Sequence, residues 1–282
     1  MAVDQAEKLR LMVSDNKKRA QILTITSGKG GVGKSNIAAS LAFCLMASKK
    51  RVLLIDADLG LANLDVILGV KARSNLSAVI SGKRNIAEII EKGPAGLKLV
   101  CGASGLTDLA DLNEFQRNRL IQELGQLEYQ ADIIIIDTGA GISRNVLSFC
   151  NSADHTLVVT TPEPTSIADA YAMIKCMAQT HSGVKISILV NMVESRGEAK
   201  KIFQRIARVA TQFLSVTVYD AGFILRDHHV KDAVAQCEPV VLMHPRCPAS
   251  YCLMALAGKI GRVAESSSDS GGFFRRVVNW FF

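Results

Sequence analysis

The feature that most constrains this chain is the nine-residue segment Ser27–Ser35, which reads SGKGGVGKS. It follows the apolar run Ile22–Thr26, and it precedes a stripe of apolar residues at helical spacing, namely Ile37, Leu41, Cys44 and Leu45. The segment satisfies the pattern G-x-x-x-x-G-K-[ST] through Gly28, Gly33, Lys34 and Ser35. Because a strand, this loop and a helix occur in the order that the pattern requires, the sequence predicts a loop that binds phosphate.

The residue types in the loop suit that chemistry. Glycines let backbone N–H groups turn toward phosphate oxygens, and the following helix presents its positive N-terminal end. We expect Lys34 to contact the β- and γ-phosphates and Ser35 to ligate Mg²⁺. The predicted nucleotide-binding residues of the loop are Gly28, Lys29, Gly30, Gly31, Val32, Gly33, Lys34, Ser35 and Asn36.

The rest of the chain alternates apolar runs with helical-length segments. The runs predicted as strands begin at Gln21 and continue with 51–56, 97–101, 133–137, 156–161, 186–191 and 216–219. Several are nearly continuous in Val, Ile and Leu, which is typical of parallel strands covered on both faces. A second helical stripe comprises Ile202, Ile206, Val209 and Phe213. This alternation predicts a doubly wound α/β fold with a mainly parallel sheet over residues 21–264.

Acidic residues follow two of these runs, and an open α/β sheet binds its ligand at the carboxyl ends of its strands. We expect Asp137 to hold Mg²⁺ through water and Asp56 to support the metal shell. Asp58 is predicted to orient the attacking water, and Thr138–Gly141 to act as a switch that responds to the γ-phosphate. The predicted reaction is hydrolysis of a nucleotide by positioning and electrostatics, with Lys29, Lys34 and Asp58 as catalytic residues.

Composition narrows the class of partner. The formal net charge is +7, which favours an anionic partner such as nucleic acid or a lipid surface. The seven cysteines form no C-x-x-C pair and mostly lie in apolar runs, so we expect buried, reduced thiols. The first 20 residues are charged throughout and lack the apolar core of a signal peptide. No apolar run approaches the ~20 residues of a membrane span.

Lys29, inside GKGGVGK, resembles the deviant Walker A motif of the MinD/ParA group, P-loop NTPases of the SIMIBI class. The resemblance implies an ATP-dependent homodimer in which Lys29 reaches the partner's nucleotide. GLANLDV, TPEPTSIADAYA and the pair Asn191-Met192 resemble the FlhG family, also called YlxH or FleN, which governs flagellar number and placement. The run before Asn191 is followed by no Lys–Asp pair of the GTPase type, so ATP with Mg²⁺ is favoured.

By the same resemblance, Asn191 contacts adenine and Gly222–Asp227 packs beside the base. Relatives often have Ile-Pro after that glycine, where this chain has Ile224-Leu225, so the resemblance does not predict the shape of the base pocket at that point. The resemblance further implies contact with flagellar switch-complex proteins and slow turnover that depends on dimerisation. No specific binding of nucleic acid is expected.

Both ends of the chain carry further motifs. Residues 1–20 contain DQAxxLR, which resembles the activator motif through which FlhG proteins engage and stimulate the SRP-type GTPase FlhF; the expected contacts are Asp4, Gln5, Ala6, Leu9 and Arg10. After a Ser/Gly linker at 265–272, residues 273–282 form an amphipathic pattern. We expect this tail to bind an anionic membrane peripherally, on the cytoplasmic face of the cell membrane, through Phe273, Phe274, Arg275, Arg276, Val277, Trp280 and Phe281.

Other classes of protein share parts of this pattern. A DNA-partitioning ATPase of the ParA type would have the same loop and a basic charge, and a division-site MinD would share the core. An iron–sulfur carrier would need cluster cysteines, for which only Cys101 and Cys150 are candidates. A binding module with an inactive nucleotide site is disfavoured because all the expected catalytic residues are present. The aromatic tail could also dock on its own core.

Overall fold

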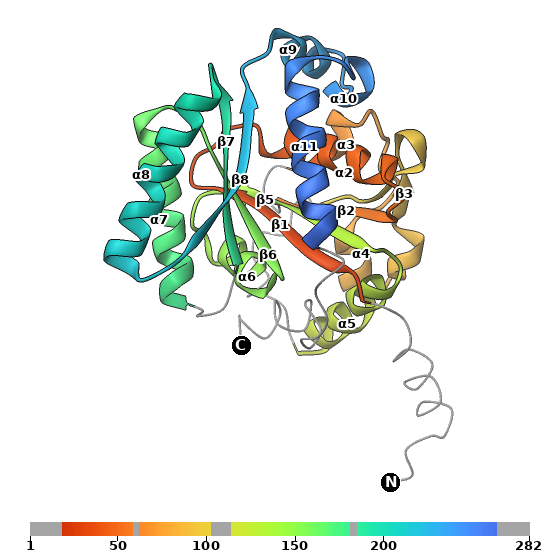
Figure 1. Ribbon diagram of the computed structural model, residues 1–282. Coiled ribbons are helices and arrows are strands. Elements are labelled where there is room, and N and C mark those ends of the chain that lie inside the picture. Colours follow the sequence, from red (N-terminus) through yellow and green to blue (C-terminus); the bar gives the residue numbers. More distant parts are fainter. Residues whose placement is uncertain (1–18, 59–61, 103–113, 181–184, 264–282) are drawn as a thin grey trace.

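The apolar runs become strands of one eight-stranded sheet in the computed structural model, which describes residues 19–58, 62–102, 114–180 and 185–263 (Figure 1). The strands are β1 (Gln21–Ser27), β2 (Val52–Ala57), β3 (Ile90–Lys92), β4 (Lys98–Val100), β5 (Ile133–Ala140), β6 (His155–Thr160), β7 (Lys185–Val193) and β8 (Val218–Leu225). Their spatial order is β3-β4-β2-β5-β1-β6-β7-β8. Every neighbouring pair is parallel except β3 and β4, so the prediction of a mainly parallel doubly wound fold is confirmed.

Helices cover both faces of the sheet because strand side chains alternate between the faces. Leu23 and Ile25 of β1 pack in one core cluster, whereas Ile22 packs in the opposite one. The first cluster is covered by α2 (Lys34–Ala47), α3 (Leu64–Ile67), α9 (His228–Ala235), α10 (Val240–Met243) and α11 (Pro248–Val263). The opposite face is covered by α4 (Leu76–Ile80), α5 (Glu114–Gly125), α6 (Arg144–Ser152), α7 (Pro164–Thr180) and α8 (Arg196–Leu214).

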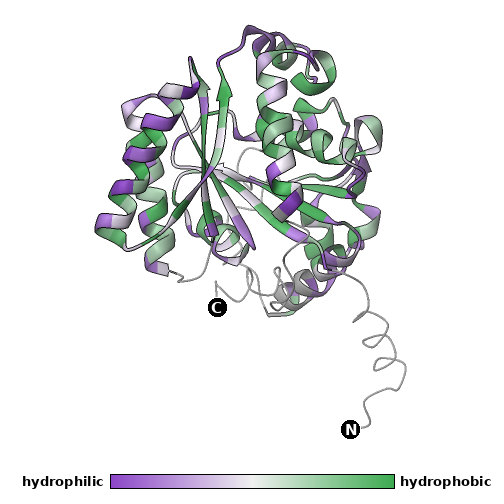
Figure 2. Cartoon of the chain, in the orientation of Figure 1, coloured by the Kyte–Doolittle hydropathy of each residue, from purple (hydrophilic) through white to green (hydrophobic). Residues whose placement is uncertain are grey.

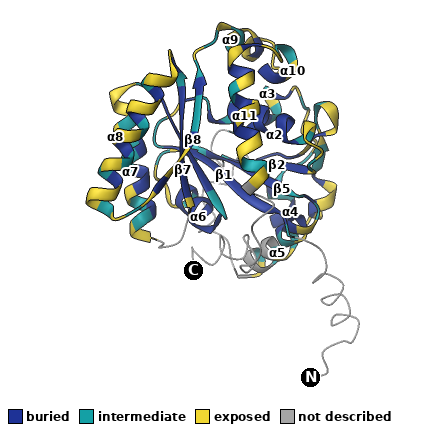
Figure 3. Cartoon of the chain, viewed as in Figure 1, coloured by how far each residue is buried: buried dark blue, intermediate teal, exposed yellow. Residues whose placement is uncertain are grey.

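The three-layer arrangement leaves the strands apolar and buried and turns the polar faces of the outer helices to solvent (Figures 2 and 3). Three short 3₁₀ turns lie in the described connections between these elements: η1 (Ile86–Glu88), η2 (Pro94–Gly96) and η4 (Gln126–Tyr129). Among the described residues, no helix is long and apolar enough to cross a membrane.

The order of the strands decides which loops meet. β1 lies between β5 and β6, so the loop after β1 leaves the middle of the sheet. Asp56 of β2 pairs with Asp137 of β5, and Asp137 also pairs with Ile25 of β1. Both predicted acids therefore reach the same edge of the sheet as the phosphate-binding loop.

Some local predictions were wrong. The run predicted to end at Tyr219 continues to Leu225, because a bulge opposite Ile188 and Leu189 accommodates Ala221 within β8. Phe213 ends the predicted stripe of α8 but is 66% exposed, and Ala210 faces the core instead. The antiparallel β3 was not predicted. The segments 1–18 and 264–282, with the predicted activator motif, linker and membrane tail, lie outside the described residues.

Candidate nucleotide site

The loop between β1 and α2 is shaped by close backbone contacts. Gly31 and Gly33 have φ values of 78° and 93°, a region that favours glycine. A Cβ atom on Gly28 would lie 2.3 Å from the backbone oxygen of Asp169 in α7, so only a hydrogen fits there. Gly33 directly precedes Lys34, the first residue of α2, so the loop ends where the helix presents its free N–H groups.

Asn191, at the carboxyl end of β7, fastens this loop from the other side. Its Nδ2 donates to the backbone oxygen of Val32 at 2.8 Å, and its Oδ1 accepts from the backbone N–H of Met192 at 2.9 Å. A Cβ on Gly33 would lie 2.7 Å from the same Nδ2. Asn191 thus positions the loop in this structure, and its predicted contact with adenine stays a prediction.

Asp137 has the chemistry of a metal ligand. It is 1% exposed, and its Oδ1 has no hydrogen-bond partner among the described residues. Burial raises the pKa of Asp137 to about 7, opposed by a hydrogen bond from Ser35 and by the charge of Lys34, while the carboxylate of Asp56 raises it further. A buried carboxylate with an open oxygen beside a serine hydroxyl is a donor set that suits Mg²⁺.

Asp56 is buried beside Asp137, but its carboxylate is hydrogen-bonded to the backbone, whereas Oδ1 of Asp137 has no partner among the described residues. Its carboxylate accepts backbone N–H bonds from Asp58, Asn63 and Leu64 at 3.0 to 3.1 Å. Burial raises its pKa to about 6, and these hydrogen bonds oppose the rise. Asp56 therefore organises the loop that follows β2 and adds negative charge near Asp137.

Asp58 lies beside Gly139, near the carboxyl end of β5. A Cβ on Gly139 would lie 3.3 Å from Oδ1 of Asp58. The predicted switch 138–141 is not a loose turn here, because β5 continues to Ala140 and the N–H of Gly141 donates to Ser27 O at 2.9 Å. The Thr138 hydroxyl donates to Ile25 O at 3.2 Å. The predicted switch is thus hydrogen-bonded to β1 and lies beside Asp58.

Lys29 makes an ion pair that the sequence did not predict. Its Nζ lies 2.6 Å from Oε2 of Glu163, which directly precedes α7, and 3.2 Å from the hydroxyl of Thr165 in the first turn of that helix. The Lys29 and Glu163 side chains are 40% and 64% exposed. This hydrogen bond is the main reason that the pKa of Glu163 is lowered, followed by the charges of Lys29 and Arg226. Arg226 in turn pairs with Glu194 at 2.8 Å.

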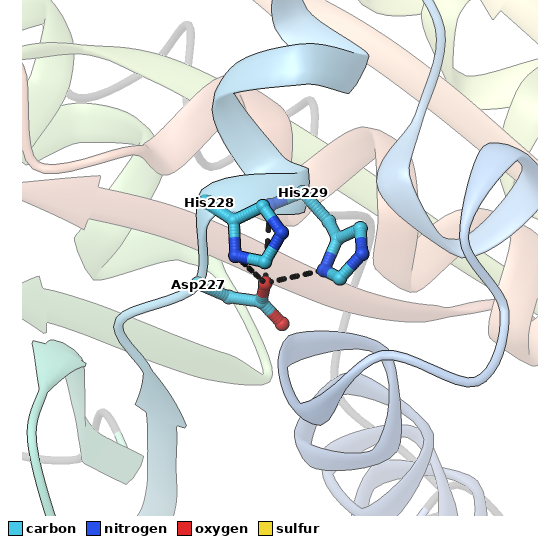
Figure 4. Close-up of side chains that lie close together, drawn as sticks. All are labelled: Asp227, His228 and His229. Atoms are coloured by element: carbon cyan, nitrogen blue, oxygen red, sulfur yellow. Dashed lines mark hydrogen bonds and ion pairs between the residues drawn. The ribbon is translucent and has the colours of Figure 1, made fainter.

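The segment predicted to lie beside the base, 222–227, comprises the end of β8 and the two residues that follow it, and it is anchored by Asp227 (Figure 4). Its Oδ1 accepts from the backbone N–H of His229 at 3.0 Å and lies 2.8 Å from Nδ1 of the same residue. Its Oδ2 accepts from the N–H of Ala249 in α11 at 3.0 Å. Burial raises the pKa of Asp227, but these hydrogen bonds outweigh it and the net pKa is lowered.

Comparison with known proteins places this arrangement in a family. The chain matches the CobQ/CobB/MinD/ParA nucleotide binding domain over residues 23–240. It belongs to this MinD/ParA family. The match spans the loop, both acidic strands and the segment that Asp227 anchors.

Individual members are similar over most of their length. The antiactivator FleN of Pseudomonas aeruginosa is 38% identical over 240 residues, covering 85% of this chain and 86% of the relative. The flagellum site-determining protein YlxH of Helicobacter pylori is 34% identical over 274 residues, covering 94% and 92%. Among solved structures, the MinC:MinD complex of Aquifex aeolicus superposes with a TM-score of 0.68 at 28% identity, covering 90% of this chain and 99% of that one.

A structure of MinD from Pyrococcus horikoshii with Mg-ADP has a TM-score of 0.71 over 89% of this chain, and at 22% identity it supports the shared fold alone. The resemblance to the MinD/ParA group, and within it to FlhG, FleN and YlxH, is thus confirmed. The iron–sulfur alternative receives no support from Cys101 or Cys150, which are 4% and 0% exposed and whose pKa values burial raises to about 12. All seven cysteines are free, and Cys237 departs from the prediction because it is exposed.

The structure brings some of the predicted site residues together and adds others that the sequence did not predict. It brings Ser35, Asp56, Asp58 and Asp137 to one edge of the sheet with the loop. Glu163, Thr165 and Arg226 were missed. The Lys29–Glu163 contact joins residues 134 positions apart, so no local pattern could have revealed it.

Proposed function

We propose that this MinD/ParA-family chain is an ATP-driven switch that controls the number and placement of flagella. The single observation that carries the nucleotide part is the open Oδ1 of buried Asp137, which lies next to the phosphate-binding loop. The flagellar part is supported by similarity to proteins named antiactivator FleN and flagellum site-determining protein YlxH over most of each chain.

The residues of the site suit hydrolysis of MgATP. Mg²⁺, when bound, supplies positive charge to the phosphates, and Ser35 and Asp137 would hold it. Lys34 is buried at the start of α2 and carries a charge that suits the β- and γ-phosphates. Asp58 lies beside Gly139 at the carboxyl end of β5, where it can orient a water molecule. Because this chemistry rests on positioning, a small displacement of the loop is expected to reduce the rate strongly.

ATP is expected to act through dimerisation. In the structure Lys29 is held by Glu163 of its own chain, and both side chains are exposed to solvent. To reach a partner's phosphate, Lys29 must exchange Glu163 for the nucleotide. A triphosphate offers more negative charge than one carboxylate, which favours the exchange when ATP is bound.

In this proposal, the two terminal segments bind the partner protein and the membrane. The 1–20 segment would engage an SRP-type GTPase of the FlhF kind through Gln5, and the 273–282 tail would bind anionic lipid through its aromatic residues and its arginines. Two tails in a dimer bind a membrane more strongly than one, which would couple membrane binding to ATP. Contacts with flagellar switch-complex proteins belong to the same proposal.

Size-exclusion chromatography with light scattering tests the switch directly. We expect Asp58→Ala to form a dimer with MgATP and a monomer with MgADP, and Lys29→Ala to stay monomeric with both. Phosphate release should fall to background in Asp58→Ala, Lys29→Ala and Lys34→Ala. A monomer under every condition would contradict the proposal.

Experiments with lipid vesicles and with cells test the proposed membrane binding and the proposed flagellar role. The Asp58→Ala dimer should sediment with vesicles of anionic phospholipid, and Trp280→Glu should abolish sedimentation without affecting dimerisation. An ATP-dependent shift of double-stranded DNA in place of lipid binding would instead support the ParA type. In the organism that encodes this chain, a Lys34→Ala allele should change the number of flagella counted by electron microscopy, and a normal count would remove the flagellar role.

A further inference from the structure

A cavity lies at the opposite end of the sheet from the candidate nucleotide site. It has a volume of about 430 Å³ and opens between the amino-terminal halves of β1, β6, β7 and β8 and the last turns of α11. Gln21 lines it at the start of β1, whereas the phosphate-binding loop follows Ser27 at the end of the same strand. At about 3.3 Å per residue, these ends are roughly 20 Å apart.

The floor of the cavity is apolar. It is formed by side chains that point to the α11 side of the sheet together with two residues of α11, namely Leu23, Leu157, Ala221, Leu256 and Ile260. The volume is in the range of pockets that hold small organic molecules, about 300 to 1,000 Å³.

The walls of the cavity carry polar groups, and one of them is a buried hydrogen-bond acceptor without a partner among the described residues. Gln21 is only 7% exposed, and its Oε1 is buried with no hydrogen-bond partner among the described residues. A buried acceptor without a partner costs free energy, so a ligand that donates a hydrogen bond there would relieve that cost. Nearby, Nε2 of His155 lies 2.7 Å from the Ser187 hydroxyl.

The charged groups around the cavity favour an anion. Lys185 and Lys259 line it, and Asp220 is the acidic side chain in the lining. Asp220 is occupied, because its Oδ1 accepts from the N–H of Gly222 at 2.8 Å. Lys259 donates to the backbone oxygen of Ala221 at 3.1 Å, which holds its ammonium at the rim. The pKa of His155 is lowered to about 4, by burial and then by the charge of Lys185, so its ring is neutral near pH 7.

We propose that this cavity is a binding site for an amphipathic organic anion. The apolar body of the ligand would lie on the Leu23 and Leu157 floor, its anionic group would face Lys185 and Lys259, and a hydroxyl or N–H would donate to Gln21 Oε1. The site is separate from the nucleotide site and does not depend on the function proposed above.

The dye 8-anilinonaphthalene-1-sulfonate is a suitable probe, because it combines aromatic rings, a sulfonate and one N–H donor. Its fluorescence is titrated with the full chain in saturating MgADP, which fills the nucleotide site. We expect one saturable site per chain. Lys185→Glu should weaken binding at least about tenfold, and Gln21→Leu about fivefold, as expected for one lost hydrogen bond.

Lys175→Glu on the exposed face of α7 is the matched control and should leave dye binding unchanged. Circular dichroism confirms that each variant is folded. The proposal is overturned if the dye does not saturate at one per chain in MgADP, if a parallel titration shows saturable binding only without MgADP, or if Lys185→Glu and Lys175→Glu bind it equally.

Discussion

Gly28→Ala tests the idea that the phosphate-binding loop is held in place by backbone contact with α7. The added methyl group would lie 2.3 Å from the Asp169 backbone oxygen and 2.4 Å from its carbonyl carbon. Real carbon contacts rarely fall below 3.0 Å, so the loop or the start of α7 must move by the better part of an ångström. Backbone atoms on both sides leave no flexible side chain to yield.

The expected cost is that of overpacking, about 1 to 3 kcal/mol in the free energy of unfolding. Because the loop N–H groups would bind phosphate by position in the proposed function, we also expect the affinity for MgADP to fall at least about tenfold. Chemical denaturation measures the first effect, and isothermal titration calorimetry measures the second.

Gly30→Ala provides a matched control within the same loop. A Cβ on Gly30 meets nothing within 4 Å, and its φ is not in the left-handed region. This variant should unfold like the wild type, or be more stable by up to about 1 kcal/mol because the unfolded chain loses freedom. The reasoning is refuted if Gly28→Ala and Gly30→Ala have equal stability and equal affinity for MgADP.

Further variants test other features. Cys237 has φ 53°, so Cys237→Gly should stabilise the protein by about 1 kcal/mol in urea unfolding, whereas Cys176→Gly within α7 should destabilise it. His155 has its pKa lowered to about 4, so its contribution to stability is complete above pH 6.5 and is lost as the pH falls toward 4; His155→Gln should remove that part of the pH profile, and an unchanged profile would contradict the assignment. Asp227 has a lowered pKa, so Asp227→Asn should cost about 1 to 3 kcal/mol at pH 7, with a gap to wild type that closes as the pH falls below 3.8; a gap that is constant with pH would refute this.

Much of the site could be predicted because the residues of the loop are contiguous in the sequence. The glycines, Lys34 and Ser35 form one segment whose order alone predicts phosphate binding. Asp56 and Asp137 were predicted from a general rule, that the carboxyl ends of parallel strands meet at one edge. The register of β2 against β5, which pairs these two residues, follows that rule.

Predictions from local patterns were wrong where contacts with other elements decided the structure. β8 runs through Asp220-Ala221-Gly222, which as a sequence reads like a turn, because a bulge against β7 keeps the strand paired. Phe213 fits the helical stripe by spacing, yet the core-facing side of α8 continues through Ala210 and Leu214, which leaves the Phe213 ring exposed.

The sequence by itself determined the class of this protein: a mainly parallel α/β fold, a loop of the phosphate-binding pattern, and acidic residues at the ends of the runs 51–56 and 133–137. These features depend on residue order within short segments. Only the tertiary structure decided that Glu163 pairs with Lys29, that Asn191 holds the loop through Val32, and that Gln21 lines the cavity beneath α11. These contacts join residues more than 130 positions apart, and their partners are selected by the order of the strands rather than by any local pattern.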